Sequence, residues 1–66
     1  MLKQYGYEIK EKKTDFLVGD NGEKYYSTRE EAMEDAKDYL LNFIIPDEYK
    51  GKVLEDFEII TQKIIG

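Results

Sequence analysis

Acidic side chains form the densest group of chemically capable residues in this 66-residue chain. If positions 30–38 are helical, at 100° per residue, all the carboxylates there fall within an arc of about 140°. We term this set the acidic stripe; it consists of Glu30, Glu31, Glu34, Asp35 and Asp38. Like-charged pairs four residues apart, such as Glu30 and Glu34, each destabilise a helix by roughly 0.3 kcal/mol. The stripe is therefore a candidate functional feature.

The stripe suits binding of a basic partner. Carboxylates spaced about 6 Å apart along a helix imitate the phosphates of a nucleic-acid strand, and would fit the basic groove of a protein that handles DNA or RNA. The alternative is that these acids only keep the chain soluble and favour the N-terminus of the helix through its dipole. The neighbouring Tyr25 and Tyr26 would face opposite ways in a strand, so one ring should be exposed, and we take Tyr26 as a further interface candidate.

Catalytic and metal-binding chemistry find little support, because the chain has no histidine and no cysteine. The hydroxyls of Ser27 and Thr28 lack an imidazole base and are explained as helix caps. Hydrolysis by paired carboxylates needs a cleft that so short a chain does not readily enclose. Asp20-Asn21-Gly22-Glu23 predicts a turn, since the oxygen ligands of a calcium loop are missing around it. We expect no enzymatic activity, no catalytic residue, no cofactor and no metal site.

Composition predicts one small folded domain over residues 1–66, because six tyrosines and three phenylalanines are available for a single core. The net charge is −5, and residues 14–48 carry ten acidic side chains against three basic ones. Such a surface repels phosphates and anionic lipids, so we expect direct binding to neither nucleic acid nor membranes. The sequence has no apolar run typical of a membrane span or a signal peptide, and we expect a cytoplasmic location.

Three strands are predicted in the first half of the chain. Tyr5, Tyr7 and Ile9 alternate with more polar residues, which indicates a strand with one buried face. Residues 14–18 favour a second strand. Asn21-Gly22 then predicts a tight hairpin that leads into a third strand over residues 23–27, antiparallel to the second.

A helix is predicted from about Thr28 to Ile45. Ser27 and Thr28 each precede a glutamate by three residues, as in a capping box, and Pro46 disfavours helical geometry at Ile45. One face carries the apolar residues, which are Ala32, Ala36, Tyr39, Leu40, Phe43 and Ile44. Residues 53–65 fit either a helix or a strand, and their β-branched side chains favour a strand over 57–64. The fold class is α+β, a small antiparallel sheet covered by one helix in the order β-β-β-α-β.

Residues 25–41 resemble the strand-to-helix segment of HicB-type antitoxins, through Ser27-Thr28-Arg29-Glu30-Glu31-Ala32 followed by Ala36 and Tyr39-Leu40. The resemblance implies a β-meander, a helix and a returning strand, and a protein that neutralises an RNase toxin by direct binding. In its size, its acidity and its lack of histidine and cysteine, the chain is also similar to phage-encoded host-takeover proteins, including DNA mimics and anti-CRISPR inhibitors. Both resemblances imply a protein that acts by binding another protein.

We therefore expect a non-enzymatic inhibitor whose acidic helix face docks on a basic, nucleic-acid-handling protein, in the manner of a DNA mimic. The alternatives are an antitoxin-like binding module and a small self-associating structural protein. The expected interface residues are Glu30, Glu31, Glu34, Asp35, Asp38 and Tyr26. Ile59, Ile60, Ile64 and Ile65 predict apolar surface at the edge of the sheet and, with it, a homodimer.

Overall fold

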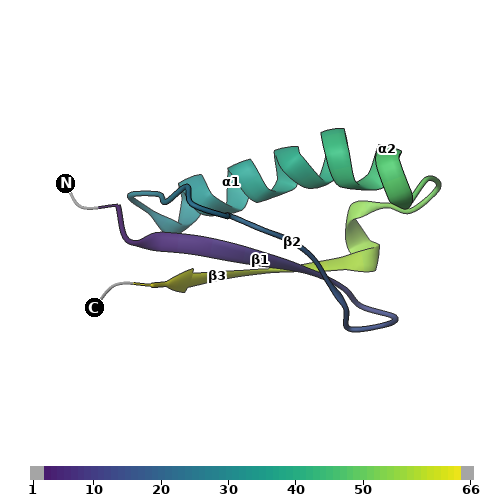
Figure 1. Cartoon of the computed structure of the whole chain (residues 1–66), viewed down its shortest axis with the longest axis horizontal. Helices are drawn as coiled ribbons and strands as arrows, with labels where there is room; N and C mark the ends of the chain where they lie inside the picture. The colour runs from purple at the N-terminus through teal and green to yellow at the C-terminus, as the bar shows by residue number, and fades with distance from the viewer. Residues whose placement is uncertain (1–2, 65–66) are drawn as a thin grey trace.

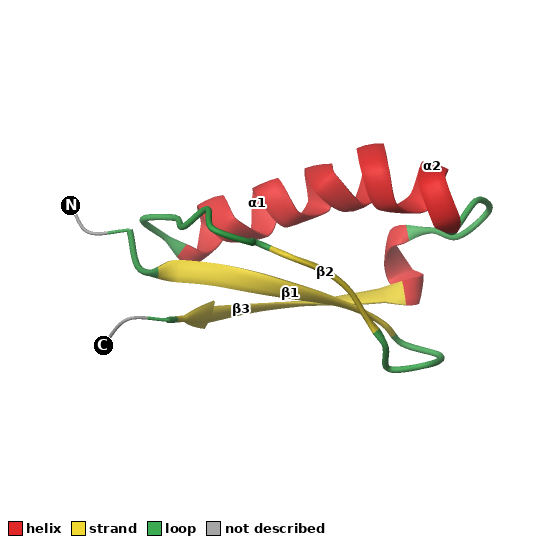
Figure 2. Ribbon diagram, viewed as in Figure 1, coloured by secondary structure: helices red, strands yellow, loops and turns green. Residues whose placement is uncertain are grey.

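A three-stranded antiparallel sheet lies under one long helical segment in the computed structural model, which describes residues 3–64 (Figures 1 and 2). The strands are β1 (Tyr5–Glu11), β2 (Leu17–Asp20) and β3 (Phe57–Lys63), and their order in the sheet is β2-β1-β3. The central strand β1 pairs antiparallel with both neighbours. The predicted α+β class is confirmed.

The core lies between one face of the sheet and the helix. On β1, Tyr7 and Ile9 are buried and stand opposite Thr61 and Ile59 of β3. Gly19 of β2 faces the helix so closely that a Cβ atom there would meet Ile44 Cδ1 at 2.9 Å. A glycine at this position therefore lets the helix pack directly on the edge strand.

The helix begins as predicted. Thr28 has an extended backbone, and its Oγ1 accepts a hydrogen bond from the amide N–H of Glu31 at 3.1 Å. This bond satisfies one of the donors that the first turn leaves free. Helix α1 (Arg29–Tyr39) then buries Ala32 and Ala36, and the same seam continues through Leu40.

The predicted end of the helix at Ile45 is wrong. A π-helical turn over Leu40–Ile44 follows α1 and leads directly into α2 (Ile45–Glu48), so the helical segment continues past Pro46 (Figure 1). Pro46 lies in the first turn of α2, where a missing N–H is tolerated. In a regular α-helix the proline ring would clash with the carbonyl group four residues earlier. The wider π turn before Pro46 changes this spacing and so avoids the clash.

The predicted hairpin at Asn21-Gly22 and the third strand over residues 23–27 are also wrong, and the second strand is Leu17–Asp20 rather than 14–18. The chain instead continues along the same edge of β1. Asn21 pairs with Tyr7, and Tyr26 forms an antiparallel bridge with Tyr5. The turn predicted at Asp20–Glu23 is present between these two pairings: Gly22 has φ of 57°, and the amide N–H of Lys24 donates a hydrogen bond to the carbonyl of Asn21 at 3.0 Å. Burial of Tyr26 against β1 thus prevails over the local preference of Asn-Gly for a hairpin.

The ambiguous C-terminal segment is a strand, as favoured, since β3 ends only one residue earlier than predicted. A single 3-10 turn (Leu54–Asp56) precedes it, and Asp56 accepts a hydrogen bond from the amide N–H of Val53 at 2.9 Å. The element order is therefore β-β-α-β. Ile65, named in the homodimer prediction, lies outside the described residues. Within residues 3–64, no helix combines the length and apolar character that crossing a membrane requires.

Candidate functional site

The acidic stripe lies along α1, as predicted. Its residues Glu30, Glu31, Glu34 and Asp38 are exposed to solvent, and Asp35 is half-buried. Their backbone positions are fixed because Ala32 and Ala36 of the same helix are fully buried against the sheet. A rigid helix therefore presents the carboxylates in a row.

Four of these carboxylates have no cationic partner in the part of the chain that the structure describes. The two ion pairs there join Lys24 to Asp35 and Lys52 to Glu11. Arg29, at the start of α1, instead lies over the ring of Tyr5, with its Cζ 5.6 Å from the ring centroid. The negative charge of the exposed stripe thus stays uncompensated by ion pairs.

Asp35 differs from the other members of the stripe in having an ion-pair partner, although Asp38 also accepts a hydrogen bond, from the side-chain amide of Asn42 at 2.8 Å. Its carboxylate accepts a hydrogen bond from the hydroxyl of Tyr26 and lies 3.3 Å from Lys24 Nζ. The Tyr26 hydroxyl and then Lys24 hold the pKa of Asp35 below its ordinary value, because both favour the ionised carboxylate. Asp35 therefore fixes the segment around Tyr26 to the helix, and this carboxylate is already engaged within the chain.

The expectation that Tyr26 offers an exposed ring to a partner is wrong. Tyr26 is only 6% exposed, and its ring packs against that of Tyr7 with 6.0 Å between centroids. Burial, followed by the hydrogen bond and negative charge of Asp35, raises the pKa of Tyr26. Side chains of successive residues in extended backbone point in opposite directions. Tyr25, which precedes Tyr26, is accordingly the more exposed of the two tyrosines.

Three shallow hollows run along one side of the helix, and neighbouring hollows share residues. The first is lined by Tyr25, Glu31 and Glu34, among others. Asp35 and Asp38 line both this hollow and the next, and Tyr39 and Phe43 line both the second and the third. The stripe therefore borders a continuous groove that leads from carboxylates to aromatic rings.

The aromatic end of this groove was not anticipated. The helical pattern placed Tyr39 and Phe43 on the buried face, but Tyr39 is partly exposed and Phe43 is 63% exposed. Only the seam formed by Ala32, Ala36, Leu40 and Ile44 is buried. The strict four-residue spacing of this seam was the signal that the buried face is narrow, since rings one residue before it rotate towards the edge of the sheet.

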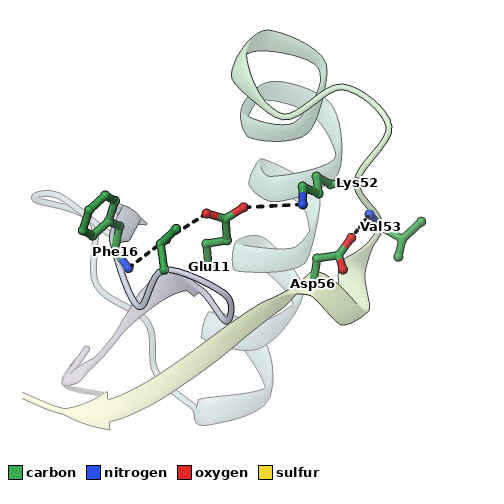
Figure 3. A network of polar contacts seen from close by, with 6 residues as sticks. Glu11, Phe16, Lys52, Val53 and Asp56 are labelled. Atoms are coloured by element: carbon green, nitrogen blue, oxygen red, sulfur yellow. Dashed lines mark hydrogen bonds and ion pairs between the residues drawn. The ribbon is translucent and has the colours of Figure 1, made fainter.

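A second polar cluster surrounds Glu11, which is only 6% exposed (Figure 3). Thr14 Oγ1 donates a hydrogen bond to Glu11 Oε1 at 2.8 Å, and Lys52 Nζ lies 3.9 Å from Oε2. Thr14 Oγ1 also accepts a hydrogen bond from the amide N–H of Phe16 at 3.3 Å. The cluster joins the loop after β1 to the loop before β3. Glu11 continues the alternation of Tyr7 and Ile9, and this alternation is the sequence signal that could have placed its side chain on the buried face.

The carboxylates are spread along the helix rather than gathered around a point. Across residues 3–64, no group of three or more metal-ligating side chains is placed to hold a metal ion. The arrangement provides an extended negative surface beside a groove, which is a geometry for binding. Comparisons of the chain with protein-family models, with curated proteins and with solved structures find no match.

Proposed function

We propose that this chain is a non-enzymatic inhibitor that docks the acidic face of α1 on a basic surface of a nucleic-acid-handling protein. The observation that carries the proposal is the row of exposed carboxylates without ion-pair partners in the described chain, namely Glu30, Glu31, Glu34 and Asp38. A cytoplasmic site of action, where such partners occur, is part of the proposal.

The physical argument concerns the free energy of these charges before and after binding. Exposed like charges at four-residue spacing repel each other in the free protein. A cationic surface relieves this repulsion and attracts the same charges, and the attraction steers the partner during diffusional encounter. Successive carboxylates lie about 6 Å apart because four residues of α-helix rise by that distance. This spacing allows the helix to follow a groove that otherwise holds a phosphate backbone.

The contacts within the chain reduce the set of residues that we propose to touch the partner. Asp35 is bound to Tyr26 and Lys24, so its role is to position the edge segment beside the helix. Tyr26 contributes through the same bond and not through an exposed ring. Glu31 and Glu34 line the first hollow together with Tyr25, which makes Tyr25 the aromatic residue best placed to contact a partner at the stripe.

The test compares two variants that change the net charge equally. The stripe variant carries Glu31→Lys, Glu34→Lys and Asp38→Lys. The control carries Glu23→Lys, Glu55→Lys and Glu58→Lys, all at exposed positions that line none of the three hollows beside the helix. A partner captured from cell lysate on the immobilised chain is identified by mass spectrometry and purified, and its affinity for each variant is measured by calorimetry.

We expect the stripe variant to bind at least about tenfold more weakly than the control variant, since reversed charges at an interface turn attraction into repulsion. Equal loss in both variants would show that only net charge matters. Unchanged binding by the stripe variant would show that the stripe is a solvated face. A captured RNase whose activity the chain blocks would support the antitoxin-like alternative.

A further inference from the structure

The aromatic end of the groove forms a surface separate from the acidic stripe. It is an open hollow of about 500 Å³ between the edge strand β2 and the C-terminal half of the helical segment. Its apolar lining includes Phe16 and Leu17 from the β2 side and Tyr39 and Phe43 from the helix. The rings of Tyr39 and Phe43 pack together, with 5.7 Å between their centroids.

These four residues gather in one place much of the large apolar surface that the described chain leaves exposed. Phe16 is 67% exposed, Phe43 63% and Leu17 51%. A contiguous apolar patch of aromatic residues with polar surroundings is typical of a surface that contacts another molecule. Scattered single residues would need no such explanation, and Leu41 and Val53, exposed elsewhere, are of that kind.

The backbone of β2 adds hydrogen-bonding capacity to the same surface. β2 lies at the edge of the sheet, and in residues 3–64 only β1 pairs with it. An edge strand leaves every second amide N–H and carbonyl directed away from the sheet. An extended segment can therefore add to β2 as a further strand while its side chains enter the neighbouring groove.

The charges around the groove identify the chemistry of that segment. Asp47 and Glu48 line the groove, and no lysine or arginine among residues 3–64 lines it. The adjoining hollow is lined by Asp20 and Asp38 and by the ion pair of Lys24 with Asp35, so its net charge is also negative. A second copy of the chain, docked symmetrically on this surface, would bring the same carboxylates against one another. A segment that carries lysine or arginine beside apolar residues has the complementary charge.

We infer that β2 and the aromatic groove bind an extended, basic and apolar segment of the partner, which adds a strand to the sheet. One apolar side chain of the segment enters between Phe16 and Phe43, and its cationic side chains face Asp47 and Glu48. The inference rests on the proposed function for the basic character of the partner. It adds a second contact site, beyond the stripe, with main-chain recognition.

The probes are blocked peptides of about eight residues in which lysine alternates with valine, leucine or phenylalanine. They are titrated into the full-length, ¹⁵N-labelled chain, and amide shifts are followed by NMR. We expect saturable shifts in β2 and at Tyr39 and Phe43. The variant Phe16→Ala/Phe43→Ala should bind about tenfold more weakly, as for truncated aromatic anchors. The control, Leu41→Ala/Val53→Ala, removes two apolar side chains that are about half exposed and lie outside the groove, and it should bind as the wild type does.

Several results would overturn the inference. One is the absence of β2 shifts with every peptide at millimolar concentration, and another is equal binding by the two alanine variants. Peptides with glutamate in place of lysine should not bind, and if they do, the charge argument fails. Shifts at β2 that appear on raising the protein concentration alone would assign the groove to a second copy.

Binding of both variants to the captured partner distinguishes failure of this inference from failure of the proposed function. If Phe16→Ala/Phe43→Ala binds as the wild type and the stripe variant does not, the groove inference is wrong and the function stands. If the stripe variant binds as the wild type and the groove variant does not, the stripe proposal is wrong and the groove remains the docking site.

Discussion

The hydroxyl of Tyr26 donates a hydrogen bond to the carboxylate of Asp35 and so joins the segment before the helix to the second turn of α1. Tyr26 also forms backbone hydrogen bonds with Tyr5 of β1 in both directions, each 2.9 Å long. One residue thus couples the central strand to the helix that carries the acidic stripe. The coupling holds when Tyr26 is protonated and Asp35 is ionised, which the directions of their pKa shifts reflect.

Replacing Tyr26 by phenylalanine should lower the free energy of unfolding by about 1 kcal/mol, because the ring stays buried and one hydrogen bond is lost. The pH dependence should change as well. The pKa of Tyr26 is raised on folding. Its contribution to the free energy of unfolding is therefore complete below its unfolded pKa of about 10 and is lost as pH rises through its folded pKa. Urea unfolding should show a smaller alkaline loss for Tyr26→Phe than for the wild type.

Asp35, the other member of this pair, gives the opposite dependence of stability on pH. The pKa of Asp35 is lowered on folding, so its contribution is present above the unfolded value of about 4 and is lost as pH falls through the folded value. Tyr26→Phe removes the largest cause of this shift and should reduce the acid loss too. Tyr25→Phe is the matched control, and identical pH profiles for the two variants would contradict the coupling.

Asn21 should stabilise the edge of the sheet through its side chain. Its Oδ1 accepts a hydrogen bond from the amide N–H of Tyr7 at 3.0 Å, and its Nδ2 donates one to the carbonyl of Lys24 at 2.6 Å. Asn21→Ala leaves a donor in the central strand unsatisfied, and we expect a loss of about 2 kcal/mol in chemical denaturation. Asn21→Asp keeps the acceptor and should lose less. A larger loss for the aspartate variant would contradict this role.

In the cluster around Glu11, the hydroxyl of Thr14 and the ammonium group of Lys52 each contribute to the free energy of unfolding, and variants can separate the two contributions. Thr14→Val removes the hydroxyl that donates to the buried carboxylate, and we expect a loss of about 2 kcal/mol. Lys52→Met removes an ion pair at 3.9 Å that is partly open to solvent, and should lose only about 0.5 kcal/mol. Thermal and urea unfolding measure both values. If Lys52→Met is the more destabilising change, the ion pair and not the hydroxyl holds the carboxylate.

The sequence predicts the elements whose local pattern and tertiary contacts agree. The alternation of Tyr5, Tyr7 and Ile9 gives β1, and the Thr28 cap gives the start of α1. The position of the acidic stripe on the helix follows from the same pattern, but the bonds that Asp35 and Asp38 make within the chain do not.

The remaining features were not predicted, because they depend on contacts distant in sequence or on an irregular helical turn. Asn21-Gly22 favours a hairpin locally, yet the side chain of Asn21 replaces a backbone acceptor beside Tyr7 and the chain continues along β1. Pro46 ends a regular helix, but a π turn before it changes the spacing. Which rings line the groove depends on Gly19, which allows the helix to approach β2.

The homodimer stays a prediction, and the structure directs its test to β3 rather than to the groove. β3 is the second edge of the sheet, and its Ile60 is half-buried. Ile64, directly after the strand, is 43% exposed. Sedimentation should show a dimer at micromolar concentration, with a melting temperature that rises with protein concentration. Ile60→Lys should give a monomer, because a charge at the edge disfavours pairing between strands. A wild-type monomer with a concentration-independent melting temperature would contradict the prediction.

The central claim is that exposed carboxylates of α1, chiefly Glu31, Glu34 and Asp38, take the place of phosphates on a basic partner. The most direct measurement is a competition titration, in which duplex DNA or RNA is added to the complex of the chain with its captured partner at several salt concentrations. We predict that nucleic acid displaces the chain in proportion to its own affinity, and that the affinity of the chain falls steeply as salt is added, because screened charges dominate the contact. Simultaneous binding of nucleic acid and chain to the partner, with an affinity insensitive to salt, would contradict the account.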